Sequence, residues 1–128
     1  EPIPAMLKLL EKHPDAELVI PSSLVSSLDH HLLPRLYLDP LIGFGTTREE
    51  DLALLRSLPD LAARGRVLVG VSRKRIVRRL SGEHGVGKLL GGSVAMALWC
   101  AVHGASVVRV HDVRETVEAL SAWSALEA

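Results

Sequence analysis

The run Arg66-Val-Leu-Val-Gly-Val71 is the feature that most constrains the fold of this chain. A continuous apolar run of this length is typical of a parallel strand, which a sheet buries on both faces. Parallel strands need a crossover between them, usually a helix, and segments with helical patterning stand on both sides of this run. The sequence therefore predicts an α/β fold in which strands and helices alternate.

The same alternation extends along the rest of the 128-residue chain. The predicted strands are residues 17–20, 35–39, 66–71 and 106–110, and the predicted helices are residues 3–12, 48–63, 88–103 and 112–125, with less clear helical patterns over 22–33 and 72–80. This order gives a parallel sheet flanked by helices, either an open sheet or part of a barrel. An eight-stranded α/β barrel needs about 250 residues, so this chain would be half of one. No linker divides it, and residues 1–128 are interpreted as a single partial domain.

Three short signals mark the expected helix ends. Thr47 with Glu50, and Asp112 with Glu115, have the spacing of a capping box at a helix N-terminus. Gly65 follows the predicted helix over 48–63, where a C-terminal capping glycine is common.

The composition excludes several classes of function. The formal net charge is zero and only 3% of residues are aromatic, so neither nucleic acid nor a membrane surface is an expected partner. No apolar run reaches the length of a membrane span. Cys100 is the only cysteine, which excludes an internal disulfide and fits a reducing, cytoplasmic location.

Polar side chains follow three of the predicted strands. They are Asp39, then Ser72 with Lys74, then Arg109 with His111, the last two alternating onto one face of their strand. Ligands of α/β folds gather at the carboxyl ends of strands, so we expect one convergent site. The alternatives are an aspartate that only forms a turn, an arginine paired with a nearby carboxylate, and a histidine in an ordinary loop.

Three other motifs suggest different functions. Gly82-Glu-His-Gly-Val-Gly-Lys88 satisfies most of the phosphate-loop pattern, but Leu89 stands where Ser or Thr would hold magnesium, and a surface loop is the alternative. Arg73-Lys-Arg-Ile-Val-Arg-Arg79 is either a solvated helix face or a nucleic-acid patch. His30 and His31 are neighbours that would not share a helix face, which favours a structural or exposed role over a metal pair.

Four segments together resemble dihydropteroate synthase, an enzyme of folate biosynthesis. They are Asp39-Pro-Leu-Ile-Gly-Phe-Gly45, Leu68-Val-Gly-Val-Ser-Arg-Lys74, Gly92-Ser93 with its Ala-rich helix, and Arg109-Val-His-Asp112. The resemblance covers residues 35–126, whereas residues 1–34 match the family poorly. It implies the C-terminal half of a (β/α)8 barrel that joins 6-hydroxymethyl-7,8-dihydropterin pyrophosphate to p-aminobenzoate, with magnesium, in a homodimer.

The resemblance also implies roles for particular residues. Asp39 would accept hydrogen bonds from the pterin, with Gly43 beside it, and Lys74 would bind the pterin near the aminobenzoate. Phe44 and Ser72 would line the aminobenzoate pocket.

The remaining roles fall at the end of the fourth strand. Arg109 and His111 would hold the pyrophosphate, with Val110 between them also in contact with substrate. Lys74, Arg109 and His111 are therefore the expected catalytic residues.

The chain also departs from the family pattern. Leu41 stands where the family usually has Gly, Thr46 where it usually has Lys, and Leu89 near a position often occupied by Arg. The resemblance implies that the magnesium ligand of the family is not in this chain. A lone half barrel would expose sheet edges and apolar helix faces, so a complementing N-terminal half or a second copy is an expected partner. The alternatives are an inactive pterin- or anion-binding remnant and a phosphate-loop nucleotide binder.

Overall fold

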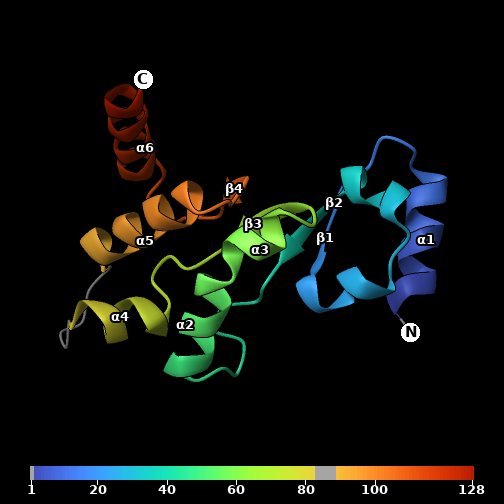
Figure 1. The fold of residues 1–128 in the computed structure, drawn as a ribbon, viewed down its shortest axis with the longest axis horizontal. Coiled ribbons are helices and arrows are strands. Elements are labelled where there is room, and N and C mark those ends of the chain that lie inside the picture. The colour runs from blue at the N-terminus through green and yellow to red at the C-terminus, as the bar shows by residue number, and fades with distance from the viewer. Residues whose placement is uncertain (1, 83–88) are drawn as a thin grey trace.

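The computed structural model describes residues 2–82 and 89–128, which form a parallel four-stranded sheet with flanking helices (Figure 1). The helices are α1 (Pro2–Lys12), α2 (Arg48–Arg56), α3 (Leu58–Ala62), α4 (Arg75–Ser81), α5 (Leu90–Val102) and α6 (Val113–Glu127), and the strands are β1 (Leu18–Pro21), β2 (Leu36–Asp39), β3 (Arg66–Val69) and β4 (Val107–Val108). The strands follow the chain order β1-β2-β3-β4, and all three pairs are parallel. The predicted α/β class is therefore confirmed. None of the described helices is long and apolar enough to cross a membrane.

The helices cover one face of the sheet and leave the other largely open. Leu38 and Val67 are register partners on the covered face, and both are fully buried. Leu68 and Val107 are partners on the opposite face, where Val107 is 37% exposed. The prediction that the run 66–71 is buried on both faces is therefore wrong for this chain, because β3 has a fully buried face and a half-buried one.

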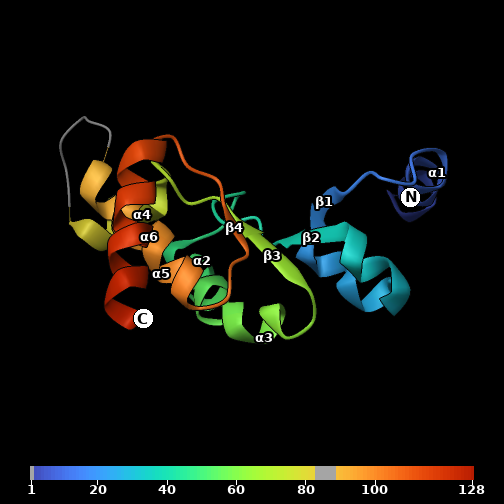
Figure 2. The same cartoon turned by 90° about the horizontal axis from the view of Figure 1, so that it is seen from above.

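Two groups of buried apolar side chains hold the covered face. The first core cluster joins α1 to β1, β2 and the 3₁₀ segment Ser22–Ser27, and its members are Met6, Leu10, Ile20, Val25, Leu28, Leu36 and Leu38. The second joins α2, α4 and α5 to β3, and its members are Ile42, Leu55, Leu58, Val67, Val69, Val71, Ile76 and Cys100. Figure 2 shows these two groups of helices at opposite ends of an elongated molecule.

Proline and glycine change two of the expected elements. The helix expected over 48–63 breaks at Ser57 into α2 and α3, because Pro59 has no N–H to continue the helical ladder. Gly65 is not among the glycines with positive φ. A Cβ atom there would lie 3.1 Å from Leu38 Cδ1, so this glycine serves close packing of the helix end on the sheet.

One capping box forms and the other does not. The Glu50 N–H donates to Thr47 Oγ1 at 3.1 Å, and the Thr47 N–H donates to Glu50 Oε1 at 2.9 Å. Asp112 makes no such bond, because its carboxylate pairs with Arg73 at 3.1 Å. A long-range ion pair has replaced the local cap.

Two further segments are shorter than expected. The predicted buried strand 106–110 reduces to Val107–Val108, because β4 lies at the sheet edge with β3 as its one neighbour among the described strands. Residues 22–33 form no single helix; two 3₁₀ segments, Ser22–Ser27 and His30–Arg35, replace it, the second with Pro34 inside it.

Candidate active site

The parallel register brings the expected site residues to one edge of the sheet. Val69 pairs with Val108, so the chain beyond these residues continues side by side, with Ser72 against His111. Gly70, Ser72, Lys74, Arg109, Val110 and His111 line one pocket of about 300 Å³. Asp39 lies beside this pocket: its Oδ2 is 4.0 Å from Nη1 of Arg109, which lines the pocket. The predicted convergence of three strand ends is thus present in the fold.

Arg109 lies across a position that carries no side chain. Its backbone N–H donates to the Val69 carbonyl at 2.8 Å, and a Cβ atom on Gly70 would lie only 2.6 Å from its Nη2. The Arg109 side chain is 56% exposed, and its one recorded carboxylate partner stands at 4.0 Å. Such a loose, exposed pair contributes little to stability. The guanidinium therefore remains available to an anion in the pocket.

Asp39 is a turn former and also faces the site. Its Oδ1 accepts from the Leu41 N–H at 2.8 Å, while Oδ2 faces Arg109. The turn places Leu41 at φ 59°, a left-handed conformation that costs a non-glycine residue about 1 kcal/mol. The carboxylate is nearly buried, so it is fixed in place beside the pocket.

Lys74 connects the end of β3 to the loop after β2. Its Nζ donates to the Ile42 carbonyl at 2.7 Å and lies 4.9 Å from the centre of the Phe44 ring. Burial lowers the pKa of Lys74, and the positive charge of Arg109 lowers it further, while Asp39 and Asp51 act in the opposite direction. Gly43, at φ +84°, runs beneath the lysine, where a Cβ atom would lie 3.2 Å from Lys74 Cδ.

Asp51 is a site-supporting residue that the sequence pattern did not reveal. It is 1% exposed and accepts from the Gly43 N–H at 3.1 Å and from Thr46 Oγ1, so it fixes the loop that carries Phe44. The available signal was its position four residues before Leu55, on the buried side of α2. It was hidden because an acidic residue in the first turn of a helix is common for electrostatic reasons.

Ser72 is buried against His111. The hydroxyl oxygen lies 2.9 Å from His111 Nδ1 and 3.2 Å from the His111 backbone nitrogen. The next residue, Arg73, has φ 58°, and its N–H donates to Ser93 Oγ at 2.9 Å, which ties this strand end to α5. Left-handed residues therefore follow both β2 and β3, and such strain collects at functional sites.

The other expected residues fall in different places. Phe44 is 63% exposed beneath Lys74, and the half-buried Val110 lines the pocket.

In the basic run 73–79, Arg73 is paired with Asp112, whereas Arg75 and Arg79 are exposed on α4. Most of the phosphate-loop candidate, residues 83–88, lies outside the described part of the chain.

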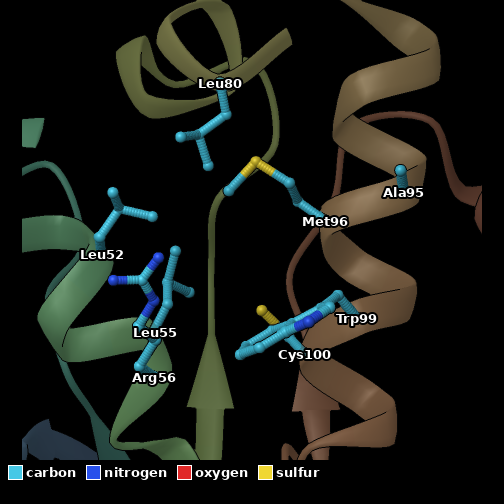
Figure 3. Close-up of a pocket in the computed structure, with 8 residues that line it drawn as sticks. All are labelled: Leu52, Leu55, Arg56, Leu80, Ala95, Met96, Trp99 and Cys100. Atoms are coloured by element: carbon cyan, nitrogen blue, oxygen red, sulfur yellow. The ribbon is translucent and has the colours of Figure 1, made fainter.

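A second pocket lies away from the strand ends. Its volume is about 330 Å³, and Figure 3 shows its mostly apolar lining from α2, α4 and α5: Leu52, Leu55, Arg56, Leu80, Ala95, Met96, Trp99 and Cys100. Burial raises the pKa of the Cys100 thiol to about 12, so it is an unreactive core group. Arg56 is the one charged residue in this lining, so the convergent chemistry belongs to the strand-end pocket.

Parallel strands, flanking helices and polar groups at the carboxyl ends of the strands are typical of ligand-binding α/β folds, either barrels or open sheets. The sequence pattern of the family described as pterin binding enzyme matches residues 25–111, which is more than half of the chain. The chain belongs to this family.

The similar proteins are dihydropteroate synthases, so the resemblance stated from the sequence is confirmed. The enzyme of Neisseria meningitidis serogroup C is 46% identical over 94 residues, covering 72% of this chain and 33% of the relative. The Escherichia coli K12 enzyme is 41% identical over 87 residues, covering 67% and 30%.

Solved structures give the same family and the same fold. The Xanthomonas albilineans synthase in complex with 7,8-dihydropteroate has a TM-score of 0.78 at 32% identity, over 98% of this chain and 55% of that one. The Thermus thermophilus synthase in complex with 6HMPPP has a TM-score of 0.71 at 40% identity, over 83% and 46%. The sheet and its helices are therefore part of a dihydropteroate synthase barrel. The chain spans about a third of the length of the curated relatives.

Proposed function

We propose that this chain carries the part of a dihydropteroate synthase active site that lies at the carboxyl ends of β2, β3 and β4. The reaction joins 6-hydroxymethyl-7,8-dihydropterin pyrophosphate to p-aminobenzoate and releases 7,8-dihydropteroate and pyrophosphate. The observation that carries the proposal is the convergence of Lys74, Arg109 and His111 on one pocket, with the Arg109 guanidinium only loosely paired. Solved synthases that hold 4-aminobenzoic acid and 7,8-dihydropteroate support the choice of substrates.

The charge changes of this reaction suit the groups around the pocket. When the C–O bond of the pterin methylene breaks, its electron pair leaves with the pyrophosphate, and negative charge develops there. Arg109 and His111 line this pocket and can donate to such an anion, and donors placed where negative charge develops stabilise the transition state. The neutral amine of p-aminobenzoate then attacks the methylene carbon and loses a proton to give the new C–N bond.

The remaining groups would orient the two substrates. Asp39, nearly buried and fixed by its bond to Leu41, would accept from the amino and ring N–H edge of the pterin. Lys74 would lie between the pterin and the aminobenzoate, with Phe44 beneath it as an exposed apolar surface for an aromatic ring.

Magnesium, a homodimer and a cytoplasmic location remain predictions from the family resemblance. Among residues 2–82 and 89–128, no three His, Cys, Asp or Glu side chains form a group that could hold a metal ion. When bound, magnesium would neutralise charge on the pyrophosphate.

A second candidate function is binding of pterin or anion without synthesis. The observation that favours it is the pocket itself, which brings the loosely paired Arg109 together with His111; this pairing suits an anion and requires no second substrate.

Calorimetric titration with pyrophosphate and with the pterin pyrophosphate, combined with an assay of dihydropteroate formation, tests both functions. Arg109→Ala should weaken pyrophosphate binding by about tenfold to a hundredfold, the value of one hydrogen bond to a charged group. Arg79→Ala is the matched control, because it removes the same charge from an exposed position on α4. Binding with product formation supports the synthase, and binding without product supports the second function. A folded chain that binds neither ligand contradicts both.

A further inference from the structure

The two strand ends after β3 and β4 are complementary in side-chain size. Where the β4 end carries Arg109, the β3 end carries Gly70, which has no side chain to obstruct the guanidinium. Two residues further on, the same face of the β4 end carries His111, and the β3 end carries Ser72. Gly70 therefore makes room for one anion donor, while Ser72 contacts the other directly.

The donors and acceptors available to Ser72 and His111 favour one direction for their contacts. A hydroxyl has one hydrogen to donate and two lone pairs that accept. The His111 backbone N–H can only donate, so Ser72 Oγ accepts from it at 3.2 Å. Among the described residues, the one acceptor recorded for the hydroxyl hydrogen is His111 Nδ1, at 2.9 Å. Because Ser72 is nearly buried, leaving that hydrogen unpaired would cost about 1–3 kcal/mol.

We propose that Ser72 is a positioning residue that holds the neutral imidazole of His111 in the tautomer protonated at Nε2. With Nδ1 accepting from Ser72, the ring proton lies on Nε2, the nitrogen that the serine does not occupy. His111 then presents an N–H donor to an oxyanion in the pocket that it lines with Arg109 and Lys74. That the oxyanion is a pyrophosphate oxygen rests on the proposed function.

The same contact makes this donor independent of the protonation state of the ring. When the imidazole gains a proton at Nδ1, that N–H donates to Ser72 Oγ and Nε2–H is unchanged, while the serine hydrogen loses its one recorded acceptor among the described residues. The charged groups around His111 are Lys74 and Arg109, which line the same pocket, and the ion pair between Arg73 and Asp112, the residues that directly follow Ser72 and His111. None of them makes a recorded hydrogen bond to the ring.

This assignment differs from the role expected from the resemblance, in which Ser72 lines the aminobenzoate pocket. A hydroxyl that contacts substrate would be replaceable by another group that reaches the substrate. A hydroxyl that sets a tautomer must instead stay in contact with Nδ1, which gives the two roles different spectroscopic consequences.

Nitrogen-15 NMR of the imidazoles, recorded without ligand at a pH where they are neutral, tests the assignment directly. His111→Gln identifies the His111 signals by their loss. In the unmodified chain Nδ1 should resonate as the unprotonated nitrogen and Nε2 as the protonated one. In Ser72→Ala the two tautomers should exchange, whereas Ser106→Ala, which removes an exposed serine hydroxyl at the start of the β4 segment, should leave the signals unchanged. A proton on Nδ1 in the unmodified chain would overturn the proposal, and so would an unchanged spectrum in folded Ser72→Ala.

Pyrophosphate titration of the same variants separates this inference from the proposed function. At a pH where the imidazole is neutral, Ser72→Ala should bind pyrophosphate about twofold more weakly than the unmodified chain, because exchanging tautomers leave about half of the His111 rings with the proton on Nε2. The deficit should shrink at a pH where the ring is protonated, because Nε2–H is then present in both proteins. A deficit of equal size at both pH values would contradict the tautomer role. If no pyrophosphate binds while the NMR result is as stated, the proposed function fails and the tautomer assignment stands.

Discussion

Two arginines at opposite ends of the sheet show how differently this chain uses the same side chain. Arg35 precedes β2, and its guanidinium donates to the carbonyls of Leu10, His13 and Ala16 at and beyond the C-terminus of α1. Arg109 follows β4 and meets a single carboxylate oxygen at 4.0 Å. The first arginine completes the hydrogen bonds of a helix end, whereas the side chain of the second makes no hydrogen bond with any residue that the structure describes.

The difference follows the direction of the strands. In parallel α/β folds the amino ends of strands serve stability and the carboxyl ends serve ligands. Arg35 lies at an amino end and Arg109 at a carboxyl end, as this rule requires. The number of protein partners around a polar group therefore separates groups that the fold uses from groups left for a ligand.

The largest expected effect concerns the one thiol, which lies in the second core cluster. Burial raises the pKa of Cys100 from 9.0 to about 12, so the reactive thiolate is scarce near neutral pH. Alkylation of the native chain should be at least about a hundredfold slower than that of the chain unfolded in denaturant. Because Cys100 is the only cysteine, mass spectrometry of the labelled chain measures this rate directly. Equal alkylation rates in the native and the unfolded chain would show that the reagent reaches the second core cluster of the native protein freely.

Replacing Arg35 should affect stability and spare binding. Arg35→Ala removes the guanidinium donors that reach the C-terminus of α1 and should lower the free energy of unfolding by about 2–3 kcal/mol. Denaturant unfolding measures this change, and Arg64→Ala, which removes an exposed arginine with one recorded bond to Ser26, should cost less than about 1 kcal/mol. A loss of pyrophosphate affinity in folded Arg35→Ala would break the contrast between the two arginines.

Gly70→Ala should instead weaken pyrophosphate binding and leave the free energy of unfolding almost unchanged. The added methyl would meet Arg109 Nη2 at 2.6 Å, and because the guanidinium is the mobile end of a long side chain, it should swing away without unfolding the protein. We expect pyrophosphate to bind about tenfold more weakly, with the free energy of unfolding changed by less than about 1 kcal/mol. Gly91→Ala is the control, because a Cβ atom there meets nothing within 4 Å. Unchanged affinity in Gly70→Ala would show that the position of Arg109 is not important for the anion.

The smallest effect is on the acid–base behaviour of Lys74. Arg109→Ala should raise the pKa of Lys74, since it removes a lowering charge, and Asp39→Asn should lower it further. Because the pKa of Lys74 is lowered in the folded chain, the unfolded chain binds more protons between that value and 10.5. The free energy of unfolding should therefore rise with pH in this interval, less steeply in Lys74→Met. Shifts of the same sign in the first two variants would contradict this account of the electrostatics.

The strand ends were predictable because their signals are local. The two-residue period of a strand predicts that Arg109 and His111 share one face. The alternation of strands and helices predicts a parallel sheet, in which the strand ends with Asp39 and Ser72 lie at the same edge as Arg109 and His111. The break at Ser57 was also visible, since Pro59 stands two residues away, but the apolar spacing over 48–63 outweighed it.

The groups that were missed depend on partners distant in sequence. Arg35 lies 25 residues from Leu10, whose carbonyl it binds, and nothing in the local pattern indicates this contact. Arg73 and Asp112 are 39 residues apart, and their ion pair replaced a capping box that the local sequence specifies well. Sequence periodicity places side chains on faces, but it does not say which distant group will compete for them.

The close approach of the Arg109 guanidinium to Gly70 also has a consequence for how the gene can change. Every single-nucleotide substitution that replaces a glycine codon with that of another amino acid introduces a residue with a Cβ atom. At most surface positions the encoded protein would tolerate several of these replacements, but at position 70 each of them would intrude on Arg109. Every missense substitution of this codon would therefore disturb Arg109, and the small ones would reduce anion binding before they reduced the amount of folded protein.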